Sequence, residues 1–167
     1  GAELMIRFLT TISILIALTS CGFKPMYKLS ESSFDFRSYS MTIMNENDTS
    51  REIKEEIKQS FPSSSEIKEE YVIEINTNES LDPLITNTDG TVAKYRIEII
   101  IDFKVRDKIK DSYLIEDMVR GFAQYTVETS EIESNDKKNR MVRTATNSAI
   151  QMMISKIQSD TSIVNDN

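Results

Sequence analysis

The sequence predicts an α+β fold: a two-layer sandwich in the order β-α-β-β-β-α, whose four-stranded, mostly antiparallel sheet carries two helices on one face. Three observations support this. Apolar and polar residues alternate in three segments, most clearly in residues 93–105. Apolar residues recur every four positions in residues 53–61, which is typical of a short helix. A wide apolar arc over residues 136–158 indicates a longer closing helix.

The strand at residues 93–105 shows the alternation best. Every second residue from Ala93 to Val105 is apolar, and the residues between them are charged except for Ile100. One face of this strand is therefore expected to be buried and the other exposed to solvent. This pattern favours an antiparallel sheet that is covered on one side only.

The other strands are shorter or less regular. A first strand is expected at residues 36–44 and a second at residues 71–75. Residues 76–91 are predicted to form a loop, because they contain the turn signals Asp82-Pro83 and Asp89-Gly90. After a turn at residues 107–110, a fourth strand is expected at residues 112–127, with Gly121 marking a bulge or bend.

Two helices complete the pattern. Thr49 and Glu52 have the spacing of a capping box, and the helix that they open is predicted to end before Pro62. The apolar arc of the last helix is wider than one sheet face should cover. Either the first helix packs beside it, which is favoured, or part of it contacts another protein.

Composition excludes several functional classes. The 167 residues have a formal net charge of −7, with 20 Lys and Arg against 27 Asp and Glu, which disfavours binding to nucleic acid. The absence of histidine removes His-based triads and imidazole metal sites, and the single cysteine excludes an internal disulfide and a multi-thiolate metal site. No catalytic residue, metal site or cofactor is predicted. A carboxylate-based hydrolase is disfavoured because no close pair of carboxylates stands out.

The amino-terminal segment has the pattern of a secretory signal. An apolar run at residues 8–18 follows Arg7, and it is shorter than the roughly 20 residues that span a bilayer. Met5 is the natural initiator of such a signal, so residues 1–4 are not counted as native. The run ends in Leu18-Thr19-Ser20-Cys21, which resembles the lipobox of bacterial lipoproteins. The alternative is a free cysteine that merely follows an apolar stretch, or an ordinary buried helix.

The lipobox predicts that Cys21 is the first residue of the mature protein. It would carry covalent acyl chains, palmitate among them, that anchor the protein to a membrane. The predicted organisation is then a lipoprotein signal peptide (1–20), a lipidated tether (21–33), an α+β domain (34–160) and a disordered tail (161–167).

Three segments together resemble the LPS-assembly lipoprotein family, LptE, in its alphaproteobacterial form. They are residues 21–27 (Cys-Gly-Phe-Lys-Pro-Met-Tyr), residues 89–96, which open the third strand, and residues 125–157, which form the closing strand and helix. Met26 departs from the leucine usual in the family, and the closing helix is richer in Met, Ile and Asn.

The resemblance implies a non-enzymatic protein. Members of this family are lipid-anchored to the outer membrane and face the periplasm, and they plug the lumen of the β-barrel translocon LptD. They assist assembly of that barrel and contact lipopolysaccharide (LPS) during its export to the cell surface. The alternative is another periplasm-facing lipoprotein, a scaffold that binds other envelope proteins.

LPS is anionic, so a chain of net charge −7 would have to bind it through a local cluster of cations. In the predicted meander, the start of the third strand and the start of the last helix lie at the same end of the domain. The candidate LPS contacts at that end are Lys94, Arg96, Lys137, Lys138 and Arg140. A rival cluster at the opposite end comprises Lys104, Arg106, Lys108 and Lys110.

Overall fold

The computed structural model describes residues 39–61 and 70–160. The signal peptide, Cys21, the tether and the carboxyl-terminal tail lie outside the described residues, as do the first residues of the predicted first strand. The elements are β1 (Tyr39–Ile43), a 3-10 turn η2 (Glu46–Asp48), α2 (Arg51–Ser60), β2 (Tyr71–Thr86), β3 (Val92–Asp107), β4 (Ser112–Thr126) and α3 (Glu131–Ser159).

The four strands form one sheet in the order β1-β2-β3-β4. β2, β3 and β4 are an antiparallel meander, whereas β1 runs parallel to β2, with Tyr39 opposite Tyr71 and Ile43 opposite Ile75. A parallel pair needs a crossover connection, which α2 supplies. The order β-α-β-β-β-α and the α+β class predicted from the sequence are confirmed.

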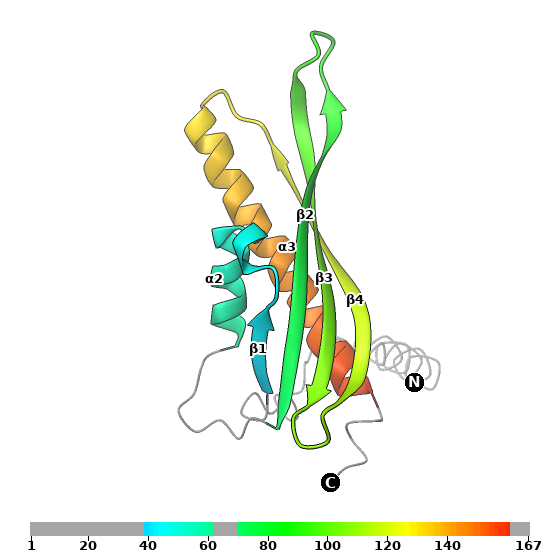
Figure 1. Cartoon of the computed structure of the whole chain (residues 1–167). Helices are drawn as coiled ribbons and strands as arrows, with labels where there is room; N and C mark the ends of the chain where they lie inside the picture. The colour runs from blue at the N-terminus through cyan, green and yellow to red at the C-terminus, as the bar shows by residue number, and fades with distance from the viewer. Residues whose placement is uncertain (1–38, 62–69, 161–167) are drawn as a thin grey trace, which may run out of the picture. The chain divides into compact units, whose positions relative to one another are not determined.

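The two helices lie on one face of this sheet (Figure 1), and buried side chains of the strands and both helices form a single core. Alternate residues of β3 supply its centre and are completely or almost completely buried: Ile97, Ile99, Ile101, Phe103 and Val105. Burying each of these side chains contributes roughly 1.5–3 kcal/mol. The prediction that one face of this strand is buried is confirmed.

The wide apolar arc of α3 is explained by α2, which packs beside it. Ile53 and Ile57 of α2 are buried in the same core as Ile150 and Ile154 of α3. Polar pairs close the helix–helix contact at the surface, where Arg143 forms an ion pair with Glu55 and the Asn147 amide donates to Glu56 at 3.0 Å. Among the described residues no helix is long and apolar enough to cross a membrane.

The predicted capping box is wrong. Ser50, not Thr49, is the N-cap residue of α2, and its side chain makes no capping hydrogen bond. Thr49 is buried instead, and its hydroxyl bonds to the Asn45 carbonyl at 2.9 Å and to the Thr77 hydroxyl at 2.8 Å. A threonine whose hydroxyl is already bonded to Asn45 and to Thr77 of β2 is not available to cap a helix.

The predicted loop at residues 76–91 is also wrong, because β2 continues to Thr86. Its polar composition argued against a strand, but β3 offers a long partner that hydrogen-bonds to alternate residues of β2 along its length. Pro83 is tolerated because β1 has ended at Ile43, opposite Ile75, so β2 is an edge strand there. Only residues 87–91 form the turn, with Gly90 at a φ of +86°.

Gly121 does not mark a bulge. The only register shift between β3 and β4 in their described pairing lies at Val105 and Arg106. Gly121 instead faces α3 at very short range: a Cβ added there would lie 1.8 Å from the Ala145 carbonyl oxygen. This glycine is needed for close contact between the helix and the sheet.

Candidate functional site: the open face of the sheet

α2 and α3 cover one face of the sheet, and no other described element covers the opposite face, which we call the open face (Figure 1). Every second residue of β3 points to this open face, and with one apolar exception these residues are charged: Lys94, Arg96, Glu98, Ile100, Asp102, Lys104 and Arg106. β4 adds apolar side chains to the same face, where Phe122 is 51% and Met118 39% exposed. The open face therefore combines charge with scattered apolar surface.

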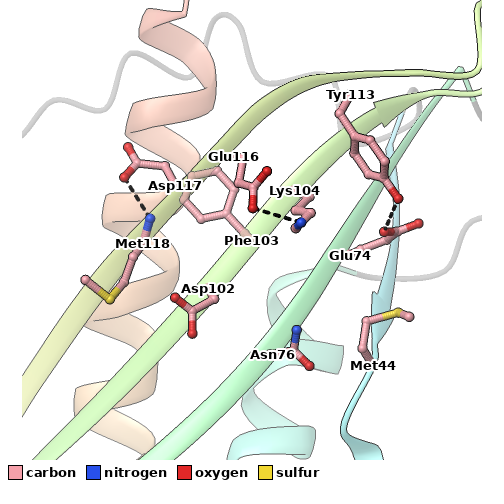
Figure 2. A pocket seen from close by; sticks show the side chains of 10 residues that line it. All are labelled: Met44, Glu74, Asn76, Asp102, Phe103, Lys104, Tyr113, Glu116, Asp117 and Met118. Atoms are coloured by element: carbon pink, nitrogen blue, oxygen red, sulfur yellow. Dashed lines mark hydrogen bonds and ion pairs between the residues drawn. The ribbon is translucent and has the colours of Figure 1, made fainter.

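A shallow groove of about 570 Å³ crosses this face (Figure 2). Three strands, β2, β3 and β4, line it together with Met44, the residue that follows β1. The lining residues are Met44, Glu74, Asn76, Asp102, Phe103, Lys104, Tyr113, Glu116, Asp117 and Met118. The residues are far apart in the sequence, and the strand register brings them together.

Lys104 lies at the centre of the groove. Its ammonium group is 2.8 Å from the Glu116 carboxylate and 5.6 Å from the ring centroid of Tyr113. The hydrogen bond to Glu116, followed by the charge of that carboxylate, raises the pKa of Lys104 above its ordinary value. Lys104 is thus held cationic and is no general base.

A second network runs along the edge of the groove. The Tyr113 hydroxyl donates to Glu74 at 3.1 Å, and Arg106 pairs with Glu74 at 3.3 Å and with Asp111 at 3.1 Å. The hydrogen bond to Asp111 is the main reason why the pKa of Arg106 is raised. Arg106 is thus shared by two carboxylates, and the groove is polar enough to suit contact with a polar surface.

The described residues contain no group of three or more carboxylates or thiols that could hold a metal ion. Of the carboxylates that line the groove, Glu116 and Asp117 pair with lysines, and Glu74 accepts a hydrogen bond from the Tyr113 phenol.

The predicted LPS contacts lie at one end of the domain but on two different faces. Lys94 and Arg96 belong to the open face, since they alternate with the buried residues of β3. Arg96 pairs with Asp82 at 3.3 Å and lies over the Phe122 ring, 5.8 Å from its centroid. Its Nε is buried and has no hydrogen-bond partner among the described residues.

The remaining candidates belong to the first turns of α3, on the covered side of the sheet. Lys137 forms an ion pair with Glu128. Lys137 and Arg140 share a shallow hollow of about 400 Å³ with three acidic residues, Glu128, Glu133 and Asp136. The five candidates are therefore near the same end of the domain without forming one continuous cationic patch.

Sequence reasoning missed the groove. Its central pair, Lys104 and Glu116, and its edge pair, Glu74 and Tyr113, depend on the register of three strands. The available signal was the alternation of β3, which identified the exposed face but not the partners across it.

No family model and no curated protein matches this chain. Solved structures do match it in fold. Rare lipoprotein B from Shewanella oneidensis is 13% identical, with a TM-score of 0.53 over 77% of this chain and 98% of the other. A minor lipoprotein from Acinetobacter baumannii is 12% identical, with a TM-score of 0.55 over 77% and 96%.

A third structure, an uncharacterized lipoprotein B from Nitrosomonas europaea, is 12% identical, with a TM-score of 0.55 over 74% of this chain and 83% of the other. All three are bacterial lipoproteins by name, and this chain has their fold.

Proposed function

We propose that this protein is an LptE-like lipoprotein of the outer membrane that acts in LPS transport and assembly. It would face the periplasm, plug the lumen of an LptD-type β-barrel translocon and help that barrel to assemble. The observation that carries the proposal is the fold shared with bacterial lipoproteins, rare lipoprotein B among them. The resemblance of residues 21–27 to the LptE start is independent support from the sequence.

The character of the open face is compatible with a plug. The interior of a large membrane barrel is polar, so a domain inside it should present charged side chains that are already paired. Lys104 with Glu116 and Arg106 with Glu74 are such pairs. The role proposed is binding and assembly, without catalysis.

The test is co-expression of the full chain with the LptD-type barrel from the same genome, followed by purification through a tag on this chain. The barrel is expected to co-purify in near-equal amount. Recovery of other envelope proteins without the barrel would contradict the proposal and favour the scaffold alternative. A matched pair of variants tests the anchor: Cys21→Ala should move to the soluble fraction, whereas Ser20→Ala, which keeps a small residue before the cysteine, should stay with the membrane.

A further inference from the structure

We propose that the free edge of β4, along residues 119–126, binds an extended segment of the barrel partner as an added strand. The inference rests on the proposed function, since the partner is the barrel named there. It concerns a surface that neither the groove nor the candidate LPS contacts include.

The orientation of the β4 backbone follows from one hydrogen bond and from the register. The Val127 N–H donates to the Ala93 carbonyl at 2.9 Å, and the pairing with β3 runs without a shift from Thr126 to Ile115. Because bonded and non-bonded positions alternate in an antiparallel pair, the odd-numbered residues of this stretch bond to β3. The N–H and C=O groups of the even-numbered residues point away from the sheet, and β4 is its last strand.

Side chains bind the outward backbone groups of Met118 but, among the described residues, not those of the outward-facing residues after it. The Asp117 carboxylate accepts the Met118 N–H at 2.7 Å, and the Lys156 ammonium donates to the Met118 carbonyl at 3.1 Å. In the described part of the chain, no side chain forms a hydrogen bond to the backbone of the next outward-facing residues, Arg120, Phe122 and Gln124. All three residues are exposed. A row of unpaired backbone groups therefore begins where the side-chain protection ends.

The other exposed edge of the sheet, on β2, is treated differently. The Asn45 side chain forms hydrogen bonds to the backbone of Thr77 there. Its side-chain NH₂ donates to the Thr77 carbonyl at 2.7 Å, and its side-chain oxygen accepts the Thr77 N–H at 3.0 Å. Farther along, Asp82 and Pro83 lie in the strand, and charges and prolines are the usual protection of an edge against pairing.

Residues 118–127 contain no proline, aspartate or glutamate, although the chain has 27 acidic residues, and Arg120 is their only charge. This stretch of β4 lacks the features that prevent pairing.

The chemistry of the edge defines its occupant. Unpaired N–H and C=O groups in a row recognise another extended backbone, which gives strand addition. Strands of a closed barrel have no free backbone groups, so the occupant must be a loop or terminal segment of the barrel protein. Phe122 offers it an apolar contact, and Arg120 keeps guanidinium donors beyond its bond to Glu98 at 2.8 Å for an acidic side chain.

The experiment uses the complex of the full chain with the barrel and measures amide hydrogen exchange in free and bound protein. We expect the outward amides of Arg120, Phe122 and Gln124 to exchange at least about tenfold more slowly in the complex. Phe122→Pro removes an outward N–H without breaking the ladder to β3, so it should weaken the complex about 3- to 10-fold. Phe122→Ala keeps the N–H, and slowed exchange at Arg120 and Gln124 should persist in that variant.

A matched control is Leu81→Pro, which removes an outward N–H from the edge of β2 and should leave binding unchanged. A complex that forms with unchanged exchange along residues 119–126 overturns this inference and leaves the proposed function standing. Failure of the complex to form overturns both. If exchange along residues 119–126 slows in the isolated protein as its concentration rises, the edge binds a second copy of this chain. That result also overturns the inference. If Phe122→Pro does not fold, hydrogen exchange along residues 119–126 in the wild-type complex alone tests the inference.

Discussion

The carbonyl oxygen of Ala145 in α3 lies so close to Gly121 in β4 that a Cβ added to the glycine would be 1.8 Å from it. Real Cβ atoms do not approach an oxygen at that distance, and the obstacle is helix backbone, which cannot rotate away. The Ala149 backbone nitrogen is also near, at 2.9 Å from the same position. The fit between α3 and the sheet thus depends on the absence of one side chain.

Gly121→Ala should destabilise the protein by roughly 2–4 kcal/mol, because the helix must move away from the sheet and loosen the contacts around it. The measurement is the midpoint of urea unfolding at unchanged slope. Gly90→Ala is the control: nothing lies within 4 Å of the added Cβ, and only the positive φ of +86° opposes it, at about 1 kcal/mol. Equal losses in the two variants would contradict the steric argument.

Asn45→Ala should cost about 1–3 kcal/mol, because it removes both hydrogen bonds that Asn45 makes to the backbone of the buried Thr77. Hydrogen exchange of the Thr77 amide should become faster than that of its neighbours in β2. Asn47→Ala, an exposed position in the adjacent turn, should leave both the stability and the exchange unchanged. An unchanged Thr77 amide in Asn45→Ala would show that Asn45 does not protect this edge.

Much of the fold could be predicted because its strongest signals are local. The alternation in β3 and the spacing of Ile53 and Ile57 each depend on a single element that buries one face. The extension of β2 to Thr86 could not be predicted, because β3 supplies the hydrogen bonds that polar residues such as Asn78 would otherwise seek from water. Local propensity indicated a loop, and strand pairing overrode it.

The candidate site was less accessible to sequence reasoning. Alternation placed Lys94 and Arg96 on an exposed face, and topology placed the α3 cations near the same end. Whether the two sets meet depends on which sheet face α3 covers, and that is a property of packing. The pairs Arg96 with Asp82 and Lys137 with Glu128 likewise join residues that are 14 and 9 positions apart.

The ion pair between Asp117 and Lys156 should give a small dependence of stability on pH. The hydrogen bond from Lys156 is the main cause that lowers the pKa of Asp117. The folded state therefore binds this proton less readily than the unfolded chain, whose aspartate pKa is about 3.9. The stabilisation is fully present above that value and is lost as the pH falls through the lower folded pKa.

Asp117→Asn should accordingly reduce the free energy of unfolding at neutral pH by less than about 1 kcal/mol, since both side chains are nearly half exposed. The difference from the wild type should shrink as the pH falls through the folded pKa of Asp117 and disappear once both states are protonated. Asp102→Asn is the control, because Asp102 forms no ion pair with any described residue. A difference that persists unchanged in acid would mean that Asp117 acts through the Met118 N–H rather than through its charge.

The two groups of candidate LPS contacts can be separated by matched charge reversals. Lys94→Glu with Arg96→Glu alters the open face, and Lys138→Glu with Arg140→Glu alters α3 by the same change in charge. We expect the first pair to reduce LPS capture about tenfold and the second less than about threefold. The reason is that the Arg96 guanidinium lies over the exposed Phe122, whereas Arg140 shares its hollow with three acidic residues. Capture by purified, folded variants at about 0.15 M salt is the measurement, since this salt screens net charge beyond about 8 Å. Equal losses would indicate a response to net charge alone, and a larger loss in the second pair would move the contact to α3.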